Sequence, residues 1–276
     1  MNRLSLKRRA QIVCALVEGN SIRATGRMTG TAKGTVLKLL VDLGRACSEY
    51  QNKALRNLLC KRLQLDEIWS FVGVKEKNRP ERDRGTYGRG DVWTWTAICA
   101  DTKLVPSWFV GTRDGGSASI FVEDLAGRLA GRVQITSDGH KAYLSAVEDA
   151  FGRDVDYAVL QKLYGVAPES EVRYSPAKCI GCRREAVMGA PDPAHVSTSF
   201  VERQNLTMRM SMRRFTRLTN AFSKKVENLE AAVALHFMWY NFGRIHQTLR
   251  VTPAMEAGVA DHVWTAEEIA GLLDPK

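Results

Sequence analysis

The chain has 276 residues, of which 45% are hydrophobic and 25% charged, a balance typical of globular rather than disordered proteins. Its net charge of +10 is concentrated in residues 1–62, which hold 13 Lys and Arg against 3 Asp and Glu, whereas the remainder holds 27 of each sign; this favours nucleic-acid binding by a small cationic head over a merely solvated basic surface. The sequence has no apolar run of about 18 residues that would predict a membrane span, and its start lacks the apolar core of a secretory signal. The six cysteines are scattered along the sequence, so we expect reduced thiols in a cytoplasmic protein.

Three helices are predicted in the head. Ser5 can cap a first helix that stops at Gly19, Ser21 begins a second that ends at Gly30, and Thr31 starts a third. Two short helices joined by a tight turn predict a helix-turn-helix, whose second helix lies in the DNA major groove. The apolar positions at helical spacing are Ile12, Val13, Leu16 and Val17 in the first helix and Val36, Leu37, Leu40, Val41 and Leu43 in the third.

The same interpretation predicts which polar side chains of the head contact DNA. A three-helix bundle used only for packing or dimerisation is the alternative, and Gly34 weakens the third helix because glycine is a poor helix former. Residues 42–62 are expected to continue as a polar, basic connector helix. The predicted DNA contacts are Thr31, Lys33, Thr35 and Lys38 on the third helix, with Arg23 and Arg27 of the second gripping the backbone.

From residue 62 onward, strand patterns and helix patterns alternate. The short link 101–103 predicts that the second and third strands form an antiparallel hairpin. Three strands, a helix, a strand, a helix and a strand is the order of a ribonuclease-H-like α/β core with a mixed sheet, in which the first and fourth strands are neighbours. The expected strands are 63–75, 91–100, 104–111, 133–136 and 156–163, the expected helices are 119–129 and 141–149, and a polar loop spans 76–90.

Three carboxylates carry the chemical prediction. Asp66 lies in the first strand, Asp138 follows the fourth, and Glu202 opens a later helix. Carboxylates gathered in this way can hold a pair of divalent cations, which clamp the attacking and leaving oxygens of a phosphodiester. Each has an alternative interpretation: Asp66 as a solvent-facing strand residue, Asp138 as a turn former before Gly139, and Glu202 as part of a capping box with Ser199.

Other polar residues near this triad have weaker assignments. Arg209 lies seven residues beyond Glu202, about two helical turns, and can hold a DNA phosphate from the same helix face. Glu67 is expected on the opposite face of its strand and is the weaker ligand candidate. His140 can line the site, and Asp101 is interpreted as a hairpin residue.

Residues 164–198 depart from the pattern, being rich in proline and glycine, and are predicted to be an irregular insertion. Cys179 and Cys182 form half of a common zinc pattern, for which His195 is a possible third ligand. No fourth ligand is visible, and a plain loop pair is favoured over a metal site.

The chain after Glu202 is basic and then amphipathic. A helix over 225–242 is expected to bury the stripe Leu229, Ala232, Val233 and Phe237, with His236 packed among apolar residues. Arg244 and His246 beyond it are predicted backbone contacts. The basic run favours a DNA-facing surface over a solvated one; its members are Arg203, Arg209, Arg213, Arg214, Arg217, Lys224 and Lys225.

Four motifs occur in order: LDEIW at 65–69, SDGHKAY at 137–143, SFVERQN at 199–205, and YNFGRIH at 240–246 followed by Thr252 and Pro253. Together they resemble bacterial insertion-sequence transposases of the DDE type, in particular the insertion-sequence-one group. The resemblance covers most of the chain from about residue 60 onward, whereas that of the head is more generic. Many relatives carry a cysteine-rich zinc finger before the helix-turn-helix; none is present here, so end recognition is expected to rest on the helix-turn-helix alone, or the start is truncated.

The resemblance implies a ribonuclease-H-like fold, two catalytic Mg²⁺ ions with Mn²⁺ as a substitute, and cleavage and strand transfer at element ends. The family's triad corresponds to Asp66, Asp138 and Glu202, and its basic residue to Arg209. The implied partners are DNA, in the form of terminal inverted repeats and target DNA, and at least one further copy of the chain. No membrane partner is implied, and the expected location is the nucleoid.

The resulting division is a helix-turn-helix module with connector over 1–62, a catalytic domain over 63–220 and a helical region over 221–276. A DNA-binding regulator that uses the head alone, and a nuclease that cuts without joining, remain as alternatives.

Overall fold

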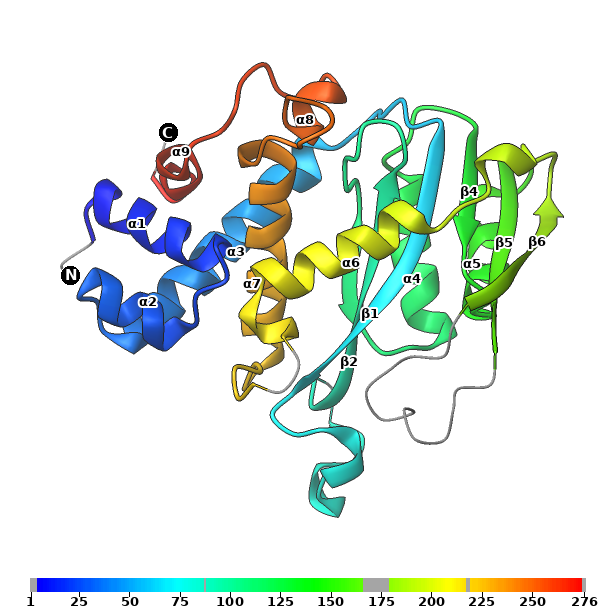
Figure 1. Cartoon of the computed structure of the whole chain (residues 1–276). Coiled ribbons are helices and arrows are strands. Elements are labelled where there is room, and N and C mark those ends of the chain that lie inside the picture. The colour runs from blue at the N-terminus through cyan, green and yellow to red at the C-terminus, as the bar shows by residue number, and fades with distance from the viewer. Residues whose placement is uncertain (1–3, 87, 166–178, 217–218, 275–276) are drawn as a thin grey trace.

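The computed structural model describes residues 4–86, 88–165, 179–216 and 219–274. Its first three helices, α1 (Leu6–Val17), α2 (Ile22–Thr29) and α3 (Lys33–Ala54), form the head at the left of Figure 1. The predicted caps are confirmed: the Ser5 hydroxyl accepts from the Arg8 backbone N–H at 3.3 Å and that of Ser21 from Ala24 at 3.1 Å. Gly30 ends α2 with φ 61°, a conformation that glycine adopts without a steric cost.

The third helix differs from its prediction in two ways. It begins at Lys33 rather than Thr31, and its N-cap residue Ala32 makes no side-chain cap. It also runs without a break to Ala54, so the predicted connector is its second half and ends eight residues before Arg62. This half packs along α7 (Val226–Met238), where Gln51 is fully buried and donates to the Ala234 carbonyl oxygen at 3.2 Å.

One mixed sheet organises the body, in the order β3-β2-β1-β4-β5-β6. The hairpin of β2 and β3 is antiparallel, as predicted, and β2 is also antiparallel to β1, while β4 and β5 run parallel to β1. This order and these directions are those of a ribonuclease-H-like sheet, which confirms the predicted fold class. The strands are β1 (Arg62–Val72), β2 (Gly90–Cys99), β3 (Trp108–Gly111), β4 (Val133–Ser137), β5 (Val155–Tyr164) and β6 (Cys179–Met188).

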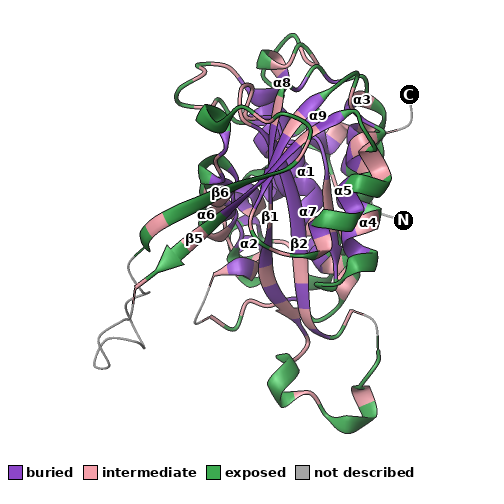
Figure 2. Ribbon diagram, turned by 90° about the vertical axis from the view of Figure 1, so that its right-hand side faces the viewer, coloured by how far each residue is buried: buried purple, intermediate pink, exposed green. Residues whose placement is uncertain are grey.

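The strand β6 corrects the prediction of an irregular insertion over 164–198. It pairs antiparallel with β5, whose first half is largely buried, and the exposed ends of the two strands project to the left in Figure 2. Cys179 and Cys182 are therefore exposed strand residues rather than loop residues, and within the described parts of the chain neither joins a group of potential metal ligands. The sequence pattern did not predict β6 because this strand is exposed along nearly all its length. It therefore lacks the alternation of apolar and polar residues that indicates a strand. Pro168, Pro176 and, farther on, Arg217 lie outside the described residues.

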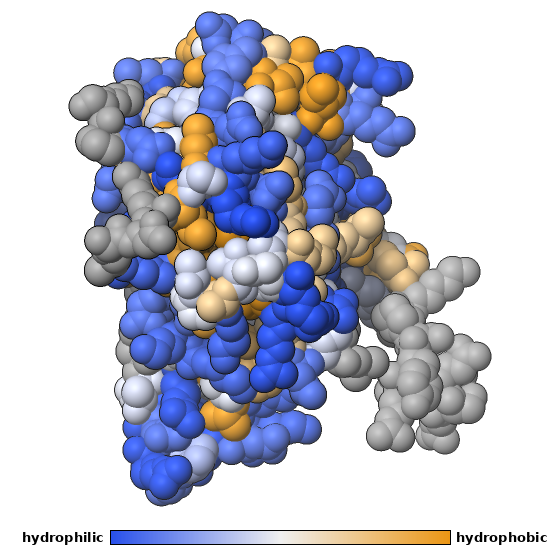
Figure 3. All heavy atoms as spheres, turned by 90° about the vertical axis from the view of Figure 1, so that its left-hand side faces the viewer, coloured by the Kyte–Doolittle hydropathy of each residue, from blue (hydrophilic) through white to orange (hydrophobic). Residues whose placement is uncertain are grey.

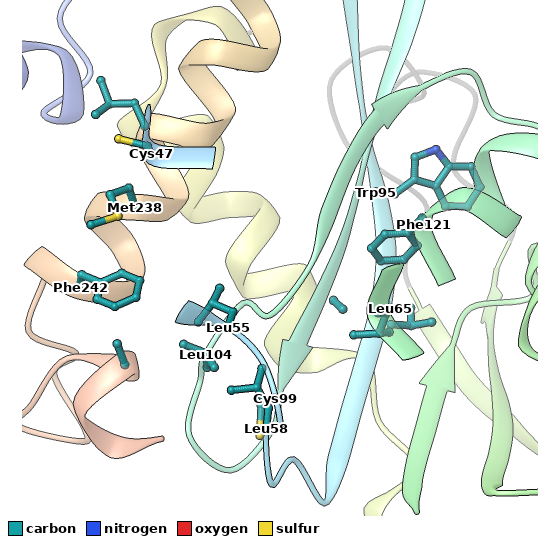
Figure 4. Close-up of a cluster of buried hydrophobic side chains, with 14 of the residues drawn as sticks. Cys47, Leu55, Leu58, Leu65, Trp95, Cys99, Leu104, Phe121, Met238 and Phe242 are labelled. Carbon is teal, nitrogen blue, oxygen red and sulfur yellow. The ribbon is translucent and has the colours of Figure 1, made fainter. Parts of the chain in front are cut away.

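Helices cover both faces of the sheet. Even-numbered residues of β1, such as Ile68 and Val72, share a buried cluster with α6 (Ser199–Ser211) and α7, whereas odd-numbered residues such as Leu65 face α4 (Gly115–Ala126) and α5 (Ala142–Phe151). Figure 4 shows Leu65, Trp95 and Phe121 on this second side. Helix α4 begins four residues earlier than predicted because the Asp114 carboxylate caps it, accepting from the Ser117 backbone N–H at 2.9 Å.

The C-terminal helices return to the head. Helix α7 buries Leu229, Val233 and Phe237 of the predicted apolar stripe, whereas Ala232 is half-buried. His236 is a buried histidine, as predicted. A π-helical turn over Trp239–Gly243 follows, then α8 (Pro253–Glu256) and α9 (Ala266–Gly271), which packs against α1. None of the described helices has the length and apolarity to cross a membrane.

Candidate functional site

Asp66 occupies the middle of β1 and faces α6. Its Oδ2 accepts from the Asn205 side-chain amide at 2.7 Å, and its Oδ1 accepts from the Glu67 backbone N–H at 2.9 Å. Burial, as the largest cause, together with the neighbouring carboxylates of Glu67 and Asp138, raises the pKa of Asp66 to about 7. Ionising such a carboxyl group beside other carboxylates is costly unless a cation is bound. A raised pKa within a cluster of carboxylates is therefore typical of a cation site.

Asp138 lies level with Asp66 because of the strand register. Strands β1 and β4 are parallel with Gln64 opposite Thr136, and each aspartate lies two residues farther along its own strand. Asp138 follows directly after the last residue of β4, and its Oδ1 accepts from the His140 backbone N–H at 2.9 Å. The interpretation of Asp138 as a turn former is thus also correct, since one oxygen fixes the turn that holds the other in place.

The third member of the observed cluster is Glu67. One carboxylate oxygen from each of Asp66, Glu67 and Asp138 lies within 4.8 Å of the others, and they form the one such acidic group among the described residues. Glu67 is buried, accepting from the Arg113 Nε at 2.7 Å and from the Tyr143 hydroxyl at 3.0 Å. Its hydrogen-bond partners lie on the opposite sheet face from Asn205, as predicted from strand alternation, and its carboxylate nevertheless lies close to those of both aspartates.

Glu202 lies in the first turn of α6, close enough that its charge raises the pKa of Asp66, as the weakest of the named causes. Its carboxylate does not join the cluster, because it forms an ion pair with Lys162 of β5 and accepts from the Thr198 hydroxyl at 2.6 Å. The alternative of a capping box with Ser199 is wrong. The N-cap residue is Thr198, and its hydroxyl bonds to Glu202 instead of to the helix backbone.

Two further residues next to the cluster escaped the sequence analysis. Asn205 and Tyr143 hold Asp66 and Glu67 in place, and both are buried. The signal for Asn205 was its position three residues after Glu202, on the same helix face. His140 stacks on Trp95 at 5.7 Å between ring centroids, and its Nε2 is buried without a hydrogen-bond partner among the described residues.

Most of the predicted DNA contacts are exposed on the surface. Figure 3 shows the side of the molecule that carries the head, which is hydrophilic over most of its area with scattered hydrophobic patches. His246 and Arg209 are half-buried; burial, as the first cause, lowers the pKa of His246. Arg244 donates to the Ser211 hydroxyl at 3.3 Å. The exposed residues are Arg23, Arg27, Lys33, Thr35, Lys38, Arg213 and Arg244.

Four of the predicted contacts come from the end of α6 or beyond it, namely Arg209, Arg213, Arg244 and His246. Arg23 and Arg27 come from α2, and Lys33, Thr35 and Lys38 come from α3. The bond from Arg244 to Ser211 brings the segment after α7 next to the end of α6. Lys33 and Arg213 line one cavity, which lies between α3 and the end of α6. The fold thus brings predicted contacts from distant parts of the sequence to one region.

No protein-family model and no curated protein matches the sequence. Among solved structures, the chain is similar to a piggyBac transposase synaptic complex with hairpin DNA, with a TM-score of 0.42 and 10% identity over 97% of this chain and 69% of that one. It is also similar to the Mos1 strand transfer complex (TM-score 0.25, 10% identity, 86% and 76% covered) and to the Mos1 mariner paired end complex with Mn (0.24, 10%, 87% and 79%). At these scores the likeness carries no argument about activity, which rests on the site itself.

Proposed function

We propose that this chain is a DNA transposase that cuts at the ends of an insertion sequence and joins them to target DNA by metal-dependent phosphodiester chemistry. The observation that supports this most is the placement of Asp66 and Asp138, level with each other on neighbouring parallel strands of a ribonuclease-H-like sheet. The cationic head supplies the DNA-binding part of the proposal, as a helix-turn-helix, and the four sequence motifs that resemble insertion-sequence transposases supply the reaction.

The residues present fit divalent cations. Oxygen ligands suit Mg²⁺ and Mn²⁺. The carboxylates of Asp66, Glu67 and Asp138 crowd one another, and the Arg113 guanidinium is paired with Glu67. The buried Oδ1 of Asn205 lacks a partner among the described residues. Two such ions, when bound, would activate water and stabilise the charge on the attacking and leaving oxygens.

In the proposed reaction, water attacks the phosphodiester at the element end and breaks its P–O3′ bond, which frees a 3′-hydroxyl. That hydroxyl then attacks a target phosphodiester, forming a new P–O bond and releasing a target 3′-hydroxyl. The protein's contribution is positioning and charge. Asn205 and the Glu67 backbone N–H fix both oxygens of Asp66, and the turn to His140 fixes Asp138.

Glu202 is proposed as the third ligand, and Glu67 is the competing choice. Glu202 is paired with Lys162, whose ammonium neutralises it at the edge of the site. If Glu202 is the ligand, Lys162 competes with the cation, so Lys162→Met should lower the Mg²⁺ concentration needed for cleavage and Glu202→Gln should abolish cleavage. If Glu67 is the ligand instead, Glu67→Gln should abolish cleavage and Lys162→Met should leave the Mg²⁺ requirement unchanged.

The predicted DNA contacts form the second part of the proposal. Arg23, Arg27, Lys33, Thr35 and Lys38 of the head would contact the terminal inverted repeat, and Arg209, Arg213, Arg244 and His246 the DNA near the cut. Pairing of two DNA ends implies at least a dimer on DNA, at the bacterial nucleoid in the cytoplasm. Removing one phosphate-contacting cation should lower the slope of log K against log salt by about 1.

The deciding experiment incubates the protein and a labelled duplex bearing the element's own end with Mg²⁺ and target DNA. Nicking at the end followed by joining, both lost in Asp66→Asn and Asp138→Asn, is the expected result. Nicking without joining would identify a nuclease instead. Binding without cutting by the unaltered protein would identify a DNA-binding regulator, and joining that persists in Asp138→Asn would refute the proposed site.

A further inference from the structure

A groove separates the head from the body, away from the carboxylate cluster. Its cavity volume is about 770 Å³, and its walls come from α1, α2 and α3 on one side and from α7 and the segment after α6 on the other. Five cationic residues line this junction groove, with no carboxylate among the described residues that line it: Arg23, Lys33, Arg213, Arg214 and Lys224. The groove is therefore complementary to an anion.

Arg214 is the unusual member of this set. Its Nη1 donates to the Ser223 hydroxyl at 2.6 Å, but its Nη2 is buried and has no hydrogen-bond partner among the described residues. Burial lowers the pKa of Arg214 to about 10, so the guanidinium is still charged at neutral pH. A largely buried cation without a counter-charge among the described residues is costly. Because Arg214 lines the groove, an anion there would supply that counter-charge.

The apolar part of the groove wall restricts what that anion is. Leu16, Val17, Ile22, Leu37, Leu40 and Leu235 line it. In a double helix the bases are paired and stacked, so a protein surface beside the backbone meets phosphates and sugars. An apolar wall next to cations instead suits a strand whose bases are unpaired, with phosphates on the cations and bases against the wall.

The size of the groove leads to the same occupant. Cavities of about 300–1,000 Å³ hold single drug-sized molecules, so this one admits a nucleotide or two from one strand and excludes a double helix. Lys224 is held at the groove with its Nζ 3.7 Å from the centre of the Phe222 ring, and that ring packs against Phe71 with 4.6 Å between the ring centroids and a tilt of 33°. This places a further cation at the rim on a fixed aromatic support.

We infer that the junction groove binds unpaired, single-stranded DNA, with a phosphate bound to Arg214. The inference rests on the proposed function only in taking DNA as the substrate, and it assigns a second DNA site distinct from the carboxylate cluster. A strand separated from its complement at the cut end would reach this groove between the head and the body.

The test measures binding of a short labelled oligothymidylate to the full chain by fluorescence anisotropy, with EDTA present so that no cutting occurs. Arg214→Met should weaken this binding about 10- to 100-fold, the range for hydrogen bonds to a charged group. It should also lower the salt slope by about 0.7, the value for one phosphate on a single strand. Binding of a blunt duplex of equal length should change by less than about twofold.

Three controls keep the outcomes separate. Arg153→Met removes an exposed cation outside the groove and should leave binding of the oligothymidylate unchanged. Arg214→Met should melt no lower than the unaltered protein, because it removes an unpaired buried charge; should it fail to fold, the exposed Lys224→Met tests the same groove with a loss in the same direction. Asp66→Asn should bind oligothymidylate normally, so a failure of the proposed catalysis would not be mistaken for a failure of this site.

Equal losses on duplex and oligothymidylate in Arg214→Met would overturn the assignment to single strands, and unchanged binding in both groove variants would overturn the site. Tighter binding of oligouridylate than of oligothymidylate would overturn the assignment to DNA.

Discussion

At the scale of single residues, the candidate site is defined by which oxygens already have partners. Asp66 has both oxygens engaged, by Asn205 and by the Glu67 backbone, while Glu67 is held by Arg113 and Tyr143. These bonds restrict each carboxylate to one orientation, which a metal site requires of its surroundings. The two groups that hold Asp66 are uncharged and do not neutralise its carboxylate, which is consistent with its raised pKa.

The raised pKa predicts a pH-dependent effect of Mg²⁺ on stability. Because the pKa of Asp66 is about 7 in the folded chain and 3.8 ordinarily, the folded state holds an extra proton between these values. Without metal, the free energy of unfolding should therefore fall as pH rises from about 4 to about 7. Mg²⁺ at a hundred times its Kd should add about 2.7 kcal/mol at pH 8, and much less at pH 5, where protons compete for the carboxylate.

Thermal melting with EDTA or Mg²⁺ at both pH values measures this effect. Asp66→Asn should abolish the Mg²⁺ stabilisation and flatten the pH dependence, whereas the exposed Asp149→Asn should preserve both. Equal stabilisation by Mg²⁺ in the unaltered protein and in Asp66→Asn would contradict the assignment of Asp66 as a ligand.

At the scale of elements, the contact of α3 with α7 joins the head to the body. Gly44 of α3 lies directly against Ala231 of α7: a Cβ built on the glycine would come 2.4 Å from the Ala231 Cα and 2.7 Å from its carbonyl oxygen. The helices approach this closely because the glycine has no side chain. In contrast, Gly34 of the same helix has no atom within 4 Å of its built Cβ.

These two glycines make a matched pair for mutation. Gly44→Ala should lower the free energy of unfolding by about 1–3 kcal/mol, because the added methyl group forces backbone apart and outweighs the gain in helix propensity. Gly34→Ala should raise it by about 0.4–1 kcal/mol, because it meets no obstacle and restricts only the unfolded chain. Urea denaturation at equilibrium measures both. A neutral or stabilising Gly44→Ala would show that the α3–α7 contact is looser than the structure has it.

At the scale of the whole molecule, the two ends of the chain are packed together. Arg9 of α1 is buried and donates to the Ala270 carbonyl oxygen at 2.9 Å and to both oxygens of Asp274 at 2.9 and 2.8 Å. Helix α9 thereby fixes α1, and α3 is fixed by α7. The head is thus held by the C-terminal helices at two places, which sets its position relative to the carboxylate cluster.

Removing the Arg9 anchor should destabilise the molecule as a unit. Arg9→Met should lower the free energy of unfolding by about 1–3 kcal/mol, since it removes charged hydrogen bonds from a buried position. Asp274→Asn should cost less, about 0–1 kcal/mol, because 39% of that side chain is exposed. The exposed Lys7→Met is the control and should stay within about 0.5 kcal/mol of the unaltered protein. Separate unfolding transitions for head and body in the unaltered protein would contradict this anchoring.

The local sequence was sufficient to predict most of the elements, though not β6, and two of the clustered carboxylates. The helix caps at Ser5 and Ser21 and the antiparallel pairing of β2 with β3 depend on neighbours close in the sequence, and these were confirmed. The link between these two strands is longer than predicted, because β3 begins at Trp108 and not at Leu104. Asp66 and Asp138 could be paired in advance because the strand order of a ribonuclease-H-like sheet makes β1 and β4 neighbours. The roles in DNA binding and metal chemistry, predicted from charge distribution and motifs, remain proposals.

Only the tertiary structure decided what surrounds those carboxylates. Asn205 reaches Asp66 across 139 residues of chain, and Tyr143 reaches Glu67 across 76. The pairing of Glu202 with Lys162, 40 residues away, depends on how α6 lies relative to β5. Contacts of this kind follow from register and helix placement, which are set by packing of the whole core and leave no periodic signal in the sequence. The Nη2 atom of Arg214, which is buried without a hydrogen-bond partner among the described residues, is a finding of the same kind, because such burial is a property of the assembled fold and not of the residue.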